Sequence, residues 1–207
     1  MSQDVLEIFQ TMNKNHIDTQ FVMQCAPLIA GLKCSNLLMV QKVQQTDAIR
    51  MLKTLESDGI YYRTLHLSDA KMTMLIYRKE ELTDHLNRPE IRQFLSWMGY
   101  ETTKLDEVLD VFVGRYRNHR EDIAAFPHEM GILLGYPLVD VIGFMENEGK
   151  NFLYNGYWKV YGNLHNTVTL FQHFQMAEKQ VFTLLASGMS ISGISKMYVN
   201  VHMRAVS

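Results

Sequence analysis

The sequence predicts an α+β fold, in which a small three-stranded antiparallel sheet in the N-terminal part packs against a predominantly helical C-terminal part. Three strand-like segments, at residues 36–43, 60–67 and 71–78, all come before residue 79. After residue 79, apolar side chains recur at the spacing of helical faces. The chain has 207 residues and contains no linker or internal repeat, so we expect one domain over residues 1–207.

The first part of the chain is expected to alternate helices and strands. A helix capped by Asp4 is predicted near the N-terminus, because the following apolar residues share one helical face: Val5, Ile8, Phe9 and Met12. The apolar segment at residues 25–31 contains a Pro and a Gly, which predicts a tightly packed turn before the strand at 36–43. Residues 46–57 form the next predicted helix, which ends at an Asp-Gly pair.

The two remaining strands, at residues 60–67 and 71–78, are separated by the short segment Ser-Asp-Ala, which has the length and composition of a hairpin loop. The rest of the chain is predicted to be helical. The predicted helices cover residues 89–98, 105–119, 127–134, 138–147, 164–187 and 190–199. In the third and fourth of these, Glu129 and Asp140 lie in the first turn, where the helix dipole favours an acidic side chain.

The composition excludes several classes of protein. Lys and Arg number 20 and Asp and Glu number 22, so the chain has no overall positive charge that would attract nucleic acid or an anionic membrane. The two cysteines, Cys25 and Cys34, are too few for a disulfide scaffold and form no CxxC pair. The sequence shows neither a signal peptide nor an apolar stretch long enough to span a membrane. We therefore expect a cytoplasmic protein.

The densest motif of the chain covers residues 126–144, and reads Phe-Pro-His-Glu-Met-Gly-Ile-Leu-Leu-Gly-Tyr-Pro-Leu-Val-Asp-Val-Ile-Gly-Phe. Together with Gly-Tyr-Trp-Lys-Val-Tyr-Gly at residues 156–162 and Cys-Ala-Pro-Leu-Ile-Ala-Gly-Leu-Lys at residues 25–33, it resembles the uncharacterised family called domain of unknown function 3793. The resemblance covers nearly the whole chain. It implies a cytosolic protein of an anaerobic bacterium and supplies no activity.

One candidate chemistry is a thiol nucleophile. Cys25 could act as the nucleophile and His128 as its base, with a carboxylate such as that of Glu129 orienting the histidine, because a thiol needs a base to ionise near neutral pH. The alternative is that Cys25 is a packed apolar residue, and its apolar neighbours favour this interpretation. His128 and Glu129 are adjacent and lack the spacing of a zinc-binding helix, so we predict no metal site.

A second candidate is an aromatic binding site. Several aromatic residues surround Lys159 in the sequence: Tyr154, Tyr157, Trp158 and Tyr161. They could stack against a flat ligand, or they could close a small hydrophobic core, and the second interpretation is favoured because aromatic side chains supply much of the buried area in any domain. The sequence contains neither a glycine-rich dinucleotide motif nor a P-loop. No cofactor is assigned.

A third candidate is DNA binding through the tail at residues 178–203, which resembles the first part of a helix-turn-helix. Only Lys196 and Arg204 are basic after its glycine turn, whereas phosphate contacts require many basic side chains. Two helices joined by a glycine turn are also common in helical proteins. This pattern disfavours DNA binding.

The sequence as a whole favours a ligand-binding or accessory protein of anaerobic metabolism. We expect its site to be lined by polar residues of the family motifs: Cys25, His128, Glu129, Tyr136, Asp140, Trp158 and Lys159. The alternatives are a thiol-dependent hydrolase or transferase that uses Cys25 and His128, and a DNA-binding regulator. The expected partner is a small molecule or another protein, and neither nucleic acid nor a membrane is expected. Enzymatic activity, oligomeric state and the ligand's identity stay open.

Overall fold

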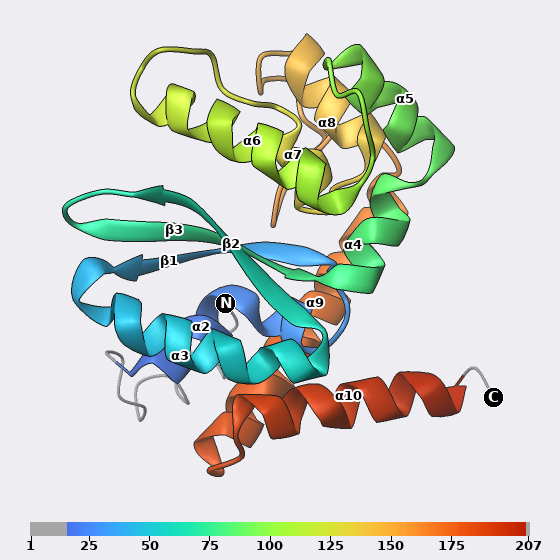
Figure 1. Ribbon diagram of the computed structural model, residues 1–207. Helices are drawn as coiled ribbons and strands as arrows, with labels where there is room; N and C mark the ends of the chain where they lie inside the picture. Colours follow the sequence, from blue (N-terminus) through green and yellow to red (C-terminus); the bar gives the residue numbers. More distant parts are fainter. Residues whose placement is uncertain (1–15, 206–207) are drawn as a thin grey trace.

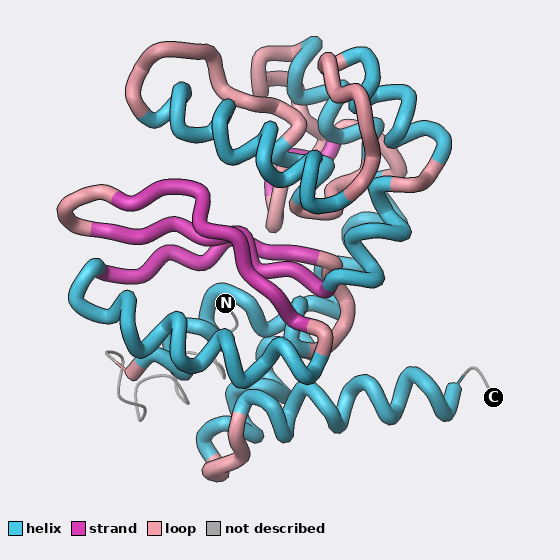
Figure 2. The backbone as a smooth tube through the Cα atoms, viewed as in Figure 1, coloured by secondary structure: helices cyan, strands magenta, loops and turns pink. Residues whose placement is uncertain are grey.

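The computed structural model describes residues 16–205, and the predicted helix at residues 5–12 lies outside them. The predicted three-stranded antiparallel sheet is confirmed (Figures 1 and 2). Its strands are β1 (Ser35–Gln41), β2 (Ile60–Leu67) and β3 (Lys71–Arg78), in the order β1-β3-β2. Helices dominate the chain after β3, so the α+β class is also confirmed.

Helices cover both faces of this sheet. In chain order the described helices are α2 (Ile17–Ile29), α3 (Gln45–Leu55), α4 (Lys79–Leu86), α5 (Pro89–Trp97), α6 (Leu105–Arg120), α7 (Met130–Leu133), α8 (Leu138–Glu146), α9 (Leu164–Ala186) and α10 (Ile191–Ala205). Helices α2, α3, α9 and α10 lie on one side of the sheet, and α5 to α8 lie on the other (Figure 1). The chain thus forms two helical layers around a central sheet.

The position of β3 between these layers explains its nearly continuous apolar sequence. Successive side chains of a strand point to opposite faces of the sheet. Met74 and Ile76 pack in the core shared with α2 and α3, whereas Leu75 and Tyr77 pack in the core shared with α6 and α7. Every residue of β3 after Lys71 is buried, because both faces are covered and both edges are paired.

The prediction of a turn at residues 25–31 is wrong, because most of this segment forms the second half of α2. Its apolar character reflects burial on every side, between the sheet, α9 and α10. Pro27 is accommodated in the last turn of the helix, where its carbonyl accepts hydrogen bonds from the backbone N–H groups of Leu32 and Lys33. Gly31 ends the helix with a φ of 72°, a left-handed conformation that glycine adopts without steric cost.

The predicted helices of the C-terminal part are confirmed, with two differences that matter for the site. The helix predicted at residues 127–134 is reduced to α7, because residue 127 has no regular structure and residues 128–129 form a turn. Residues 154–160 form a small hairpin that was not predicted, made of β4 (Tyr154–Asn155) and β5 (Lys159–Val160). No helix of the described part is long and apolar enough to cross a membrane.

Candidate functional site

A cavity of about 290 Å³ lies between α8, the segment leading into α7, and the β4–β5 hairpin. Five of the residues expected from the sequence line it: His128, Tyr136, Asp140, Trp158 and Lys159. The other lining residues are Phe126, Met130, Gly131, Val141, Phe144, Asn155, Gly156 and Tyr157. The structure thus brings together two motifs that are separated in the sequence.

Asp140 holds the hairpin against α8. Its Oδ2 accepts a hydrogen bond from the indole Nε1 of Trp158 at 2.7 Å, and its Oδ1 accepts from the backbone N–H groups of Tyr161 and Gly162 at 2.7 and 2.9 Å. The side chain is buried, and a buried carboxylate is stable only when donors satisfy it. Asp140 therefore fixes the walls of the cavity rather than offering a free acid to a ligand.

Trp158 and Tyr136 form the aromatic wall. Their rings stack with centroids 4.6 Å apart and an interplanar angle of 23°, and the ring of Phe171 from α9 packs edge-to-face with Trp158 at a centroid distance of 4.6 Å. Trp158, Val160, Phe171 and Phe174 make a separate small core. The aromatic segment therefore fills a core, as the sequence favoured, and also lines the cavity.

His128 lies between two other rings. Its centroid is 5.4 Å from that of Phe126 and 5.8 Å from that of Phe144. No other described residue forms a hydrogen bond with the imidazole nitrogens, although the residue lines the cavity. The two phenylalanines open and close the motif at residues 126–144, and the sequence interpretation did not assign them to the site.

Lys159 supplies the positive charge of the cavity wall. Its Nζ donates a hydrogen bond to the carbonyl oxygen of Gly149 at 2.7 Å and lies 5.7 and 5.1 Å from the ring centroids of Phe144 and Phe152. Cation–π attraction to these two rings helps to hold the ammonium in place. Within the described residues, no carboxylate pairs with it.

Glu129 lies behind the cavity and does not line it. Its Oε1 accepts hydrogen bonds from Arg115 Nη1 at 2.9 Å and from the Tyr100 hydroxyl at 3.1 Å. Burial and this carboxylate raise the pKa of Tyr100, which stays neutral. Glu129 was expected to interact with the dipole at the start of a helix. Instead, its ion pair with Arg115 links α6 to the segment that carries His128.

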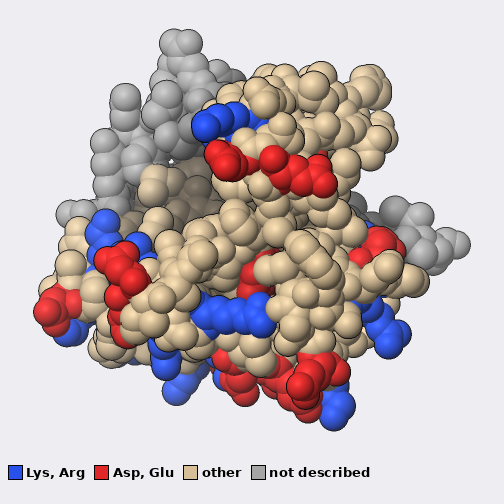
Figure 3. All heavy atoms as spheres, turned by 90° about the horizontal axis from the view of Figure 1, so that it is seen from above, with Lys and Arg blue, Asp and Glu red and all other residues tan. Residues whose placement is uncertain are grey.

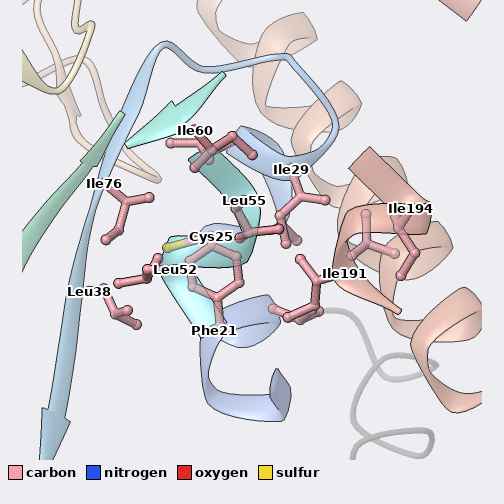
Figure 4. Packing of buried hydrophobic residues seen from close by; sticks show 14 of the residues in the cluster. Phe21, Cys25, Ile29, Leu38, Leu52, Leu55, Ile60, Ile76, Ile191 and Ile194 are labelled. Carbon is pink, nitrogen blue, oxygen red and sulfur yellow. The ribbon is translucent and has the colours of Figure 1, made fainter. Parts of the chain in front are cut away.

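Cys25 lies in a different part of the molecule. It is fully buried in the core between α2 and the sheet, beside Phe21, Leu38 and Leu52 (Figure 4). Burial raises the pKa of the thiol to about 12, which keeps it protonated near neutral pH. No described hydrogen bond or ring contact links Cys25 to His128. The structure therefore supports the packing interpretation of Cys25 and gives the thiol-enzyme alternative no geometric basis.

Two glycines allow the hairpin segment to pack closely against α8 and α9. A Cβ atom at Gly143 would lie 2.5 Å from Tyr161, and one at Gly156 would lie 2.4 Å from Phe171. Real Cβ atoms do not approach this closely, so a larger residue would push the hairpin away from α8 or α9. Both glycines belong to the motifs that carry the family resemblance, and close packing is the physical reason for them here.

The tail considered for DNA binding is docked on the core. Lys196 pairs with Asp58 at 3.3 Å, and Ser192 donates a hydrogen bond to the same carboxylate at 2.6 Å. Buried Arg78 donates to the Ser195 hydroxyl at 3.2 Å. One of the two basic residues after the turn is thus paired within the protein. On the face shown in Figure 3, Lys and Arg are interspersed with Asp and Glu and form no continuous basic surface.

The described residues contain no cluster of three or more His, Cys, Asp or Glu side chains that could hold a metal ion. A family model described as "Protein of unknown function (DUF3793)" matches residues 21–195, which include every residue lining the cavity. No curated protein and no solved structure matches the chain.

Proposed function

Because the chain belongs to the DUF3793 family, whose description names no activity, we propose a function from the site itself: the protein binds a small molecule in the cavity between α8 and the β4–β5 hairpin. One observation carries the proposal. Four residues named from the sequence as ligand-binding, Tyr136, Asp140, Trp158 and Lys159, line one cavity together with His128.

The chemistry of the walls supports this proposal. Binding sites for small molecules are mostly apolar concave surfaces with a few polar groups that orient the ligand. Here the walls are largely aromatic, and His128 and Lys159 are among the polar groups that have donor capacity left. The volume of about 290 Å³ suits a ligand smaller than a typical drug molecule.

The proposed setting is the cytoplasm of a bacterium, where the protein would act as a binding or accessory component of metabolism. The family resemblance and the two unpaired thiols, Cys25 and Cys34, support a reducing compartment. We propose no nucleic-acid or membrane partner, because the charge is balanced and the tail is docked on the core.

Native mass spectrometry of the protein purified without oxygen tests the binding function. The matched variant is Asn155→Trp, which places a large side chain at an exposed position on the cavity wall. We expect the wild-type protein to carry a reproducible extra mass, either as purified or after incubation with the small-molecule fraction of its host cells. The Asn155→Trp protein should lose this mass because the indole occupies the ligand's volume.

The control is Gln175→Trp, the same kind of change at an exposed position of α9 that does not line the cavity. It should retain the extra mass. A wild-type protein that stays bare under both conditions would contradict the proposal, and so would an extra mass that persists in Asn155→Trp. Circular dichroism melting of the three proteins shows whether each variant is folded.

A further inference from the structure

The cavity contains a positive charge without a negative partner. Lys159 Nζ has three N–H donors, and the protein uses one of them, in the hydrogen bond to the Gly149 carbonyl. The side chain is only partly exposed, so water solvates the ammonium incompletely. A partly buried ammonium gains most from an anion that completes its hydrogen bonds.

Asp140 lines the same cavity but does not pair with the Lys159 ammonium. Both oxygens of Asp140 already accept hydrogen bonds, one from Trp158 and two from backbone N–H groups. Asp140 also forms no ion pair with Lys159 in the described structure. The remaining donors of Lys159 are therefore available to a ligand.

His128 contacts the same aromatic ring as Lys159. Its ring centroid and Lys159 Nζ lie 5.8 and 5.7 Å from the centroid of the Phe144 ring, so one aromatic side chain contacts both. The imidazole has no hydrogen-bond partner among the described residues, and it can donate one N–H in its neutral form. His128 therefore adds a second group with donor capacity to the cavity wall.

The remaining walls favour a flat, apolar body. Tyr136, Phe144, Tyr157 and Trp158 line the cavity, and aromatic rings pack well in stacked or edge-to-face arrangements. A phosphate or diphosphate would require several charged donors, whereas the only Lys or Arg on this wall is Lys159. One carboxylate on the ligand would balance the single ammonium of Lys159.

We propose that the ligand is a planar aromatic carboxylate of one or two rings, with its carboxylate at Lys159 and its rings against the aromatic walls. This inference rests on the proposed binding function and specifies its ligand class. A volume of about 290 Å³ accommodates such a molecule.

Isothermal titration calorimetry with two probes of the same shape tests the proposal. The probes are 2-naphthoate, which carries the carboxylate, and 2-naphthamide, which is neutral. We expect 2-naphthoate to bind the wild-type protein roughly tenfold more tightly, because only it gains a charge-assisted hydrogen bond. Lys159→Met should abolish this preference, and Lys159→Arg should retain most of it.

The control variant is Lys150→Met, which removes the same charge from a nearby exposed side chain that pairs with Glu148 and does not line the cavity. It should keep the preference for 2-naphthoate. Equal binding of both probes, or a preference that survives in Lys159→Met, would overturn the ligand class while the binding function stands. If neither probe binds, the carboxylate proposal is also wrong, and the mass measurement on Asn155→Trp separately decides the binding function.

Discussion

At the scale of single residues, Asp140 explains why two separate motifs form one site. It lies in the first turn of α8, where the sequence predicted a favourable interaction with the helix dipole. In the structure its carboxylate accepts three hydrogen bonds, one from Trp158 of the hairpin and two from the residues that follow β5, at distances between 2.7 and 2.9 Å. A local sequence rule finds the position of such an acid but not its distant partners.

Asp140→Asn should therefore destabilise the protein. The amide has only one acceptor oxygen, so its NH₂ group must face either the indole N–H or two backbone N–H groups, which are also donors. Leaving a buried donor unpaired costs about 1 to 3 kcal/mol of unfolding free energy. Urea denaturation measures this loss, and Asp84→Asn, at an exposed position of α4, provides the control. Equal stabilities of the two variants would show that Asp140 does not hold the hairpin.

At the scale of elements, polar contacts from α4 and α6 help to hold the short helix α7 and the turn before it. Arg115 from α6 pairs with Glu129 at 2.9 Å, and Nε2 of His85 from α4 contacts the Ile132 carbonyl oxygen at 3.1 Å. A helix of one turn has little stability of its own. Contacts from its neighbours therefore keep α7, and with it His128, in position.

His85 should make stability depend on pH. Burial, with a further contribution from Arg88, holds the pKa of His85 below its ordinary value of 6.5. As the pH falls below about 6.5 the unfolded chain takes up this proton before the folded protein does, so the unfolding free energy falls with pH. One histidine contributes at most about 1.4 kcal/mol per pH unit.

The variant that tests this contribution is His85→Gln, whose side-chain amide can still donate to the Ile132 carbonyl but does not titrate near pH 6. Urea denaturation at pH 7 and pH 5 should show a smaller loss of stability in His85→Gln than in the wild-type protein. His173→Gln changes an exposed histidine of α9 and should behave like the wild type. An unchanged pH dependence in His85→Gln would exclude this role.

At the scale of the whole molecule, the sheet was more predictable than the helices around it. The strands β2 and β3 begin and end where the strand-like segments and the hairpin loop placed them, because these signals are local. The segment at residues 25–31 was misassigned because an apolar run with a Pro is typical of a turn, while its burial by α9 and α10 depends on residues far along the chain.

The site likewise combines residues that local sequence signals identify and residues whose positions depend on distant contacts. Trp158, Tyr136 and Asp140, which line the cavity, were singled out because polar and aromatic residues stand out in a long motif. Cys25 was grouped with them for its chemistry, although it belongs to the core on the opposite face of the sheet from α7. Phe126 and Phe144 were missed, because a phenylalanine in a cavity wall has the same sequence signature as one in a core.

The C-terminal helix completes the core of the molecule, and this position bears on the DNA-binding alternative. Ile191 and Ile194 of α10 are buried against α2, and Ser195 receives a hydrogen bond from buried Arg78. Figure 4 shows both isoleucines pointing into the same cluster as Ile29 of α2. A helix that reads DNA must present a face to the duplex, whereas this face of α10 is already covered.

Ile194→Ala should consequently lower the unfolding free energy by about 2 to 5 kcal/mol, the usual cost of truncating a buried isoleucine and leaving a cavity. Met197→Ala, on an exposed side of the same helix, should cost less than about 1 kcal/mol. Urea denaturation of the two variants measures the difference. If Ile194→Ala is as mild as Met197→Ala, α10 contributes little to the core and is free to leave it. Salt-dependent association with duplex DNA would then be the next measurement, because the argument against a DNA-binding tail depends on its docking.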